Sequence, residues 1–172
     1  AQPSGLSLDA GATRLFVADS ETSAIRAIDL PGGGVSTLLG AGLFEFGDID
    51  GPATLARLQH PLGVSSWPDD PQGPSLLIAD TYNHRIKRLD LQTREVRTLI
   101  GAGAPGGFAD GPGPSARFSE PGGLAIARGT LFVADTNNHR LRVVDLPGTA
   151  AESGRRPGEV RTLEIDLSRH AH

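Results

Sequence analysis

A histidine-arginine pair occurs twice in closely similar surroundings, and it is the first place to look for chemistry. Residues 79–91 read ADTYNHRIKRLDL and residues 134–146 read ADTNNHRLRVVDL, so His84-Arg85 matches His139-Arg140. A histidine in a polar turn can titrate near neutral pH or bind a ligand. No nucleophile and carboxylate recur beside the pair in a triad arrangement, and a third copy of the stretch has Ser23-Ala24 instead. The pattern favours a building unit over an active site, and we predict no catalytic residue.

An aspartate recurs in all three copies of this stretch, at Asp19, Asp80 and Asp135. A catalytic group is needed once per site, whereas a residue that sets the geometry of a repeat is needed in every copy. An aspartate after a strand can accept hydrogen bonds from the amides of its own turn, and a following Asn tolerates positive φ. We therefore expect these three aspartates to be structural turn residues.

Two further motifs are similar to ligand sites but lack the context that those sites need. The DIDG stretch at residues 48–51 offers two calcium-type ligands, without the third acidic position or the closing Glu of an EF-hand loop. GAGAPGG at residues 101–107 has the glycines of a dinucleotide loop, but it lies between antiparallel units and not between a strand and a long helix. The chain has no cysteine, which excludes thiolate ligands. We predict no metal and no cofactor.

The elements that carry these residues form a repeat. The three Ala-Asp pairs at residues 18–19, 79–80 and 134–135 are 61 and 55 residues apart. Each copy contains four short apolar runs separated by turn residues, as in GLAI, TLFVAD, LRVVDL and VRTLEI of the last copy. The 23 glycines and 13 prolines among 172 residues indicate many tight turns. The sequence predicts an all-β fold of β-propeller blades, each with four antiparallel strands.

A segment of about twenty residues follows the fourth strand of the first two copies. It reads AGLFEFGDIDGPATLARLQHP from residue 41 and GAGAPGGFADGPGPSARFSEP from residue 101. Arg57 and Arg117 follow Asp50 and Asp110 at the same separation in the two segments. This spacing favours a local ion pair or a backbone brace, and a ligand-facing arginine is the alternative. We place the blades at residues 3–60, 61–120 and 121–167, followed by a tail at residues 168–172.

Composition narrows the classes of partner. The formal net charge of −4 argues against a general phosphate-binding surface, so we expect no nucleic-acid partner. No run approaches the roughly 18 apolar residues of a membrane span, so we expect no membrane partner and a soluble chain. The composition leaves the compartment open, the cytoplasm included. Because the chain contains no methionine, we expect it to be a fragment or a processed product.

The motifs resemble a known repeat family. A P-x-G-[LV] motif followed by [LF]-[IV]-A-D-T-x-N-H-R-[IL]-[KR] is the signature of NHL repeats and covers nearly the whole chain. The G-A-G…D-G…A-R-F…P segment, together with ADSETSAIRAID, is similar to bacterial proteins in which an NHL propeller follows a thioredoxin-like domain. Propellers of that family have six blades, so the resemblance implies that this chain is the C-terminal half of a ring.

Three blades cannot close a propeller, because known rings have roughly four to eight. Each terminal blade is expected to expose an apolar face with no neighbour. We expect a second copy of the chain, as a homodimer of half-rings, or the missing blades to complete a six-bladed ring.

Partner contacts are expected where the copies differ, and exposed aromatic side chains suggest a contact surface, since Trp and Tyr are favoured at binding hot spots. The candidate contact residues are Phe44, Phe46, Trp67, Tyr82, His84, Arg85, His139, Arg140, Arg57 and Arg117. For Phe44, Phe46 and Trp67 the alternative is that they cover the edges of neighbouring blades.

Two functions from different classes remain open. The sequence favours a non-catalytic binding or scaffolding module that recognises a protein or a small ligand through its loops. The alternative is a hydrolase or lyase whose site forms in the central channel only in the complete ring, and the fold alone does not decide between them.

Overall fold

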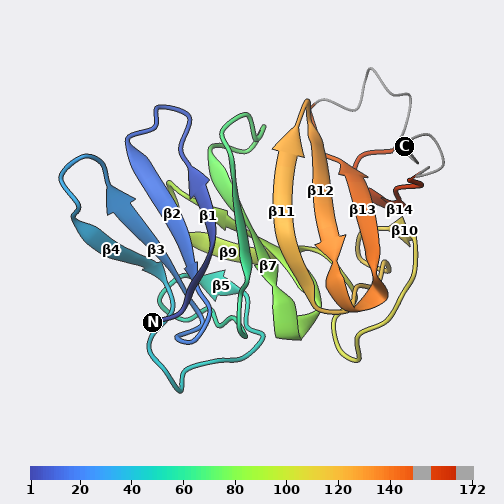
Figure 1. Ribbon diagram of the computed structural model, residues 1–172, viewed down its shortest axis with the longest axis horizontal. Coiled ribbons are helices and arrows are strands. Elements are labelled where there is room, and N and C mark those ends of the chain that lie inside the picture. The colour runs from blue at the N-terminus through green and yellow to red at the C-terminus, as the bar shows by residue number, and fades with distance from the viewer. Residues whose placement is uncertain (149–155, 166–172) are drawn as a thin grey trace, which may run out of the picture.

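The computed structural model describes residues 1–148 and 156–165, which form three antiparallel sheets arranged side by side (Figure 1). The first sheet contains β1 (Pro3–Leu8), β2 (Arg14–Asp19), β3 (Ala24–Asp29) and β4 (Val35–Leu39). The second contains β5 (Gly51–Pro52), β6 (Gly63–Trp67), β7 (Ser75–Asp80), β8 (Arg85–Asp90) and β9 (Glu95–Ile100). The third contains β10 (Gly111–Pro112), β11 (Pro121–Ala127), β12 (Thr130–Asp135), β13 (Arg140–Asp145) and β14 (Glu159–Thr162). The predicted all-β, three-blade fold class is confirmed, and the predicted tail at 168–172 lies outside the described residues.

Each blade is a meander of four strands in chain order, and the inserted segments add a fifth strand to two of the blades. The second sheet has the order β5-β9-β8-β7-β6, and the third has the order β10-β14-β13-β12-β11. The first inserted segment (residues 41–60) thus places β5 on the outer edge of the second blade. The second inserted segment (residues 101–120) likewise places β10 on the outer edge of the third blade. Each inserted segment therefore belongs structurally to the blade that follows it.

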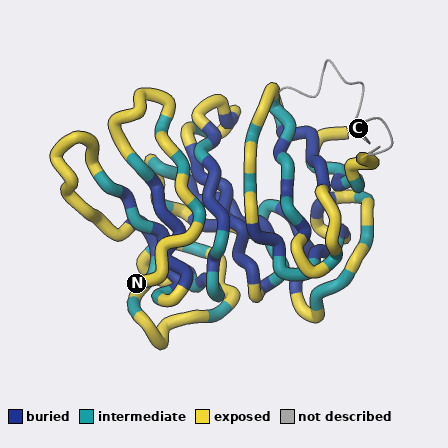
Figure 2. The backbone as a smooth tube through the Cα atoms, viewed as in Figure 1, coloured by how far each residue is buried: buried dark blue, intermediate teal, exposed yellow. Residues whose placement is uncertain are grey.

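The hydrophobic core lies between blades and not inside them, because a single sheet can bury a face only against a neighbour. The buried residues form two groups, one between the first and second blades and one between the second and third, where Figure 2 shows the dark-blue chain. Both inserted segments contribute fully buried side chains to these groups: Ala56 and Leu58 to the first, and Ala116 and Phe118 to the second. The inserted segments thus fill the space between consecutive blades.

The turn between the second and third strands of a blade ends with a residue in the left-handed conformation in all three copies. Two of these turns contain the short 3₁₀ helices η1 (Thr81–Asn83) and η2 (Thr136–Asn138). The residue that takes the left-handed conformation is His84 (φ 56°) or His139 (φ 52°), and Ser23 (φ 47°) in the first blade. The expected role of Asn at positive φ is therefore wrong, because the asparagines lie within the 3₁₀ turns.

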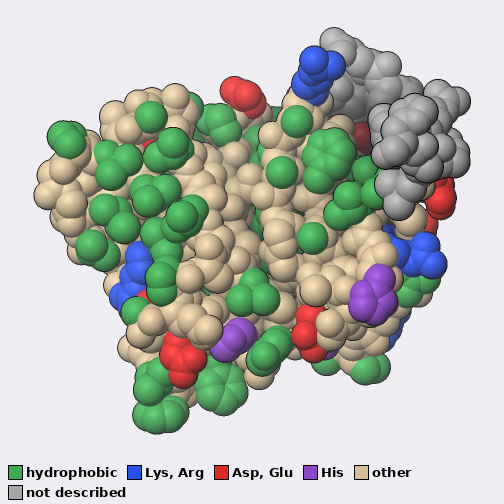
Figure 3. All heavy atoms as spheres, viewed as in Figure 1, with side chains coloured by type: hydrophobic (Ala, Val, Ile, Leu, Met, Phe, Trp, Pro, Cys, Tyr) green, Lys and Arg blue, Asp and Glu red, His purple; other side chains and the backbone are tan. Residues whose placement is uncertain are grey.

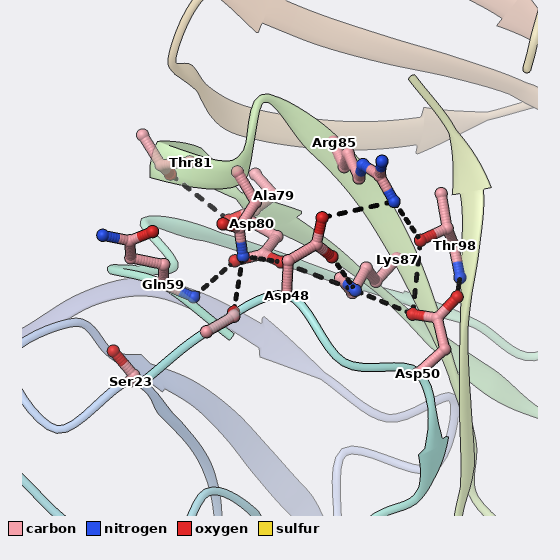
Figure 4. A network of polar contacts seen from close by, with 12 residues as sticks. Ser23, Asp48, Asp50, Gln59, Ala79, Asp80, Thr81, Arg85, Lys87 and Thr98 are labelled. Carbon is pink, nitrogen blue, oxygen red and sulfur yellow. Dashed lines mark hydrogen bonds and ion pairs between the residues drawn. The ribbon is translucent and has the colours of Figure 1, made fainter. Parts of the chain in front are cut away.

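Each blade carries a basic residue at the third position of its third strand, and in the second blade this residue is Lys87. Its side chain has no exposed surface, and its Nζ lies 2.6 Å from Asp48 Oδ1 and 2.7 Å from Asp50 Oδ1 of the first inserted segment (Figure 4). Asp80 Oδ2, at the end of β7, lies 3.8 Å from the same nitrogen. Lys87 therefore joins the inserted segment to the middle of the blade.

The third blade repeats this arrangement with an arginine. The guanidinium of Arg142 is fully buried; its Nη2 lies 2.5 Å from Asp110 Oδ1 and its Nη1 2.7 Å from Asp135 Oδ2. Arg142 also donates to the carbonyl oxygens of Ala109 and Arg117. An aspartate from the inserted segment and an aspartate from the second strand thus hold one buried cation between them.

The aspartates that end the second strands also bind the segment arriving at each blade. The amide of Gln59 donates to Asp80 Oδ1 at 2.7 Å, and the amide of Ser119 donates to Asp135 Oδ1 at 2.8 Å. Neither side chain caps its own turn, so the expected bonds to the turn amides are wrong. The amides instead come from residues immediately after Leu58 and Phe118, which ties the end of each inserted segment to the blade that it enters.

Burial raises the pKa of Asp80 to about 7, although the amide of Gln59, the side chain of Asn83 and the charge of Lys87 lower it. The negative charge of Asp48 also raises the pKa of Asp80, but by less than burial does.

This raised pKa predicts a pH dependence of stability. Since the folded-state pKa lies above the ordinary value of 3.8, Asp80 contributes stability that is complete below that value and is lost as the pH rises through about 7. Asp80→Asn cannot titrate, so the advantage of the wild type over this variant in free energy of unfolding should decrease between about pH 4 and pH 7. Urea denaturation of both proteins across this range measures it. An advantage that grows with pH would show that the carboxyl is ionised throughout.

Candidate functional site

Exposed aromatic side chains gather at one end of the boundary between the first two blades. Leu43, Phe44 and Phe46 of the first inserted segment lie there with His60 and Tyr82, and Glu21, Ser23 and Gln59 complete a pocket of about 330 Å³. We call this the aromatic groove. Phe44 is 85% exposed, Phe46 57% and Tyr82 46%, in contrast to the buried aromatics of the core. The loop that carries Phe44 and Phe46 extends below the sheets in Figure 1.

The floor of the aromatic groove is held by backbone contacts. The rings of His60 and Tyr82 stack with centroids 4.7 Å apart and an interplanar angle of 9°. The amide of Tyr82 donates to Gln59 O, and the amide of His60 donates to Ser23 Oγ. Three segments of the chain thus meet at the stacked pair.

The two inserted segments differ in the part that forms this site. Asn83 Nδ2 donates to Gly47 O in the first segment, and Asn138 Nδ2 donates to Gly107 O in the second, so these glycines correspond. In the four positions before these glycines the first segment reads LFEF and the second reads GAPG. The residue after each glycine differs too, since Asp48 contacts Lys87 and Arg85 whereas the Phe108 ring lies 4.5 Å and 4.8 Å from the guanidinium carbons of Arg140 and Arg142.

Trp67 does not belong to this surface. It is 4% exposed and packs in the core between the second and third blades. The prediction of Trp67 as an exposed contact is therefore wrong, and the alternative, that it covers the edge of a blade, describes its place. The sequence suggested a loop at Trp67, because the polar stretch PDD follows it directly.

The histidine of the repeated pair performs the same structural task as a serine. His84 Nδ1 accepts from the amide of Glu120 at 3.1 Å, just as Ser23 Oγ accepts from the amide of His60 at 3.2 Å. Gly106 lies so close to the His84 ring that an added Cβ would come within 2.8 Å of Cε1. His139 of the third blade is exposed. A building role explains why serine replaces histidine in the first copy.

The candidate arginines bind within the chain. Arg85 pairs with Asp48 at 3.3 Å, and Arg140 lies over Phe108. Arg57 pairs with Glu45 at 3.1 Å and donates to the carbonyl oxygens of Leu55 and Ala56, and Arg117 donates to Pro105 O. The expected local ion pairs of these arginines with Asp50 and Asp110 are wrong, because both aspartates turn toward the buried cations, whereas the backbone brace is present.

The aromatic groove offers apolar area, the stacked His60–Tyr82 pair and an acidic rim at Glu21. In residues 1–148 and 156–165, no group of three or more His, Cys, Asp or Glu side chains is placed to hold a metal ion. Over the same ranges, no helix has the length and apolar character needed to cross a membrane. His60 and Leu43 were missed by the sequence analysis, because only the folded chain brings them beside Tyr82.

His84 and Ser23 accept equivalent hydrogen bonds from backbone amides, so a serine variant of His84 can serve as a control. His84→Ala should lower the free energy of unfolding by about 1–3 kcal/mol, because the amide of Glu120 loses its acceptor. His84→Ser should recover part of this loss, and His139→Ala should change stability by less than about 0.5 kcal/mol. Chemical denaturation of the three variants measures this. Equal losses for the alanine variants would contradict the structural role of His84.

Comparison with known proteins agrees with the repeat architecture. The family model for the NHL repeat matches residues 118–144. Protein SUPPRESSOR OF QUENCHING 1, chloroplastic, from Arabidopsis thaliana is 45% identical over 96% of this chain and 15% of its own length. NHL repeat-containing protein 2 from Homo sapiens is 46% identical over 85% of this chain and 21% of its own length. The chain thus spans about a fifth or less of the length of these relatives.

Solved structures share the fold at low sequence identity. An auxiliary nutrient binding protein from Bacteroides ovatus superposes with a TM-score of 0.69 and 19% identity, covering 92% of this chain and 37% of that structure. Virginiamycin B lyase from Staphylococcus aureus gives a TM-score of 0.57 with 13% identity, covering 96% of this chain and 42% of that structure. The likeness is one of fold, and this chain corresponds to part of each ring. Together with the three blades and the repeat match, these similarities identify the chain as a segment of an NHL-repeat β-propeller.

Proposed function

We propose that this propeller segment is a non-catalytic binding or scaffolding module whose aromatic groove receives an apolar or aromatic side chain of an extended protein segment. The similarity to NHL-repeat proteins supports a repeat-based module. It does not favour the alternative of a hydrolase or lyase site in the central channel.

The observation that carries the proposal is the exposure of Phe44, Phe46 and Tyr82 around one pocket. Large aromatic side chains dominate binding hot spots because they bury much area with few rotatable bonds. The sheets beneath provide a rigid base, and variable loops on a rigid scaffold are the usual place for recognition.

The charge at the rim indicates the kind of partner. Glu21 lines the aromatic groove, whereas the carboxylate of Glu45, in the same loop as Phe44 and Phe46, is paired with Arg57. A partner with a basic residue beside its apolar side chain would complement this rim, and the charge pair would add mainly to specificity and to the rate of association.

A peptide selection tests this function. Peptides selected against the wild-type protein from a random library should contain an aromatic or long aliphatic residue flanked by Lys or Arg. Tyr82→Ala and Phe46→Ala should weaken one such peptide about tenfold or more, as expected for hot-spot residues. Fluorescence polarisation measures the affinities, and the thermal midpoints show whether the variants remain folded.

Leu55→Ala is the matched control, since Leu55 is an exposed apolar residue of the same inserted segment outside the aromatic groove. It should leave peptide binding unchanged. Equal binding by all variants would contradict the proposal, and so would a large loss of stability in Tyr82→Ala, which would make Tyr82 part of the core.

We further propose that other blades, from a second copy or from another polypeptide segment, complete the ring around this module. Support comes from the two terminal blades, where apolar residues remain exposed: Leu6, Leu8 and Val35 on the first and Leu141 and Leu163 on the third. The solved propellers that resemble this chain are longer than it is, which agrees with a partial ring.

A further inference from the structure

The second and third blades bind their inserted segments in the same way. Asp50 accepts from Lys87 Nζ and from both the amide and the hydroxyl of Thr98. Asp110 accepts from Arg142 and from the amide and the hydroxyl of Thr162. In both blades the cation and the threonine face each other across the third and fourth strands. A basic residue opposite a threonine is thus the receptor for the aspartate of an Asp-Gly strand.

The first blade has the same receptor. Arg26 faces Thr37 across β3 and β4 in the same register, and its guanidinium contacts Asp19, Thr22 and Thr37. In the described part of the chain no fifth strand pairs with β4. The side chain of Arg26 is 30% exposed, whereas those of Lys87 and Arg142 have no exposed surface.

An open pocket lies beside Arg26. It has a volume of about 270 Å³ and is lined by Ala1, Pro3, Val17, Asp19, Arg26, Ile28 and Val35. Val17, Ile28 and Val35 have the positions that Val133, Val144 and Val160 have in the third blade, by strand register. Val35 is 66% exposed, whereas Val160 is fully buried.

The third blade shows what such a pocket holds. Phe118 of the second inserted segment is fully buried with Val133, Val144 and Val160, and its ring centroid lies 5.2 Å from the guanidinium carbon of Arg142. Leu58 is buried in the same way against the second blade. The pocket beside Arg26 therefore matches the place of a large apolar side chain from an inserted segment. Figure 3 shows hydrophobic side chains gathered over this sheet.

We propose that the first blade receives the inserted segment of a further NHL-type blade, with an Asp-Gly strand and an Ala-Arg-Leu or Ala-Arg-Phe end. Its aspartate binds Arg26 and Thr37, its Gly-Pro pair extends the sheet at β4, and its Leu or Phe fills the pocket. This inference rests on the proposal that other blades complete the ring, and it is independent of the aromatic groove.

A second copy of the chain does not fit this receptor. The sequence contains two Asp-Gly pairs, Asp50-Gly51 and Asp110-Gly111, and both are engaged by blades of their own chain. The partner is thus a blade that does not belong to this chain. Pro3 pairs with Asp19 as Pro121 pairs with Asp135, so a residue joined directly before Ala1 would take the position of Phe118. Ala1 lies at the pocket, next to where Leu58 or Phe118 would end.

A copy of the second inserted segment can serve as the probe for this receptor. A variant carries a copy of residues 101–118, GAGAPGGFADGPGPSARF, fused directly before Ala1. The extension should raise the thermal midpoint by about 4 °C or more, because it buries the apolar pocket and the cation. Hydrogen exchange at the amide of Thr37 should slow at least tenfold, since that amide gains a carboxylate acceptor.

Two matched controls make the test specific. In the first control, asparagine replaces the residue copied from Asp110, and the slowed hydrogen exchange at Thr37 should be lost. In the second control, alanine replaces the residue copied from Phe118, and most of the rise in the thermal midpoint should be lost. Equal gains from all three extensions, or none from the first, would overturn the proposal. So would light scattering of the original chain at twice 17.9 kDa together with slow exchange at Thr37, which would assign the receptor to a second copy. Peptide binding at the aromatic groove tests a different surface, so a failure of this proposal can be distinguished from a failure of the proposed binding function.

Discussion

The second and third blades each depend on one buried cation on the third strand, which lies between carboxylates from separate parts of the chain. A buried charge costs several kcal/mol unless it is paired and fully hydrogen-bonded. Lys87 and Arg142 have no exposed surface, and each is paired with an aspartate of its inserted segment beside the aspartate that ends the second strand. This pairing couples the inserted segment, the second strand and the third strand, which backbone hydrogen bonds alone would not link in this way. It also explains why the inserted segment joins the following blade.

The cation also ties one blade to the next. The same aspartates that approach it, Asp80 and Asp135, accept the amides of Gln59 and Ser119, directly after the apolar residues that fill the space between blades. Packing of Leu58 and Phe118 is thereby coupled to the polar network behind them. The loops before Gly47 and Gly107 lie outside this network and differ in sequence. The part of the inserted segment that differs between the copies, which includes Phe44 and Phe46, thus rests on a constant frame.

The repeats, the strands and the blade count could be predicted from the sequence, because strand periodicity and turn residues are local signals. The partners of the aspartates could not. Arg57 follows Asp50 at the same spacing as Arg117 follows Asp110, and this spacing suggested local ion pairs. The two aspartates instead bind Lys87 and Arg142 of the third strands, which are distant in sequence. A usable signal was present, since Arg26, Lys87 and Arg142 each follow the repeated aspartate at the same distance. Trp67 was misjudged because burial between blades depends on neighbours that no local pattern reveals.

A double-mutant cycle on Asp110 and Arg142, read by urea denaturation, tests the central role of the buried cation most directly. If the cation locks the inserted segment to the blade, Asp110→Asn and Arg142→Gln should each be strongly destabilising, and the double variant should lose less than the sum of the two, by about 1–3 kcal/mol. Losses that add within about 0.5 kcal/mol would contradict the account, because the two side chains would then contribute independently of each other.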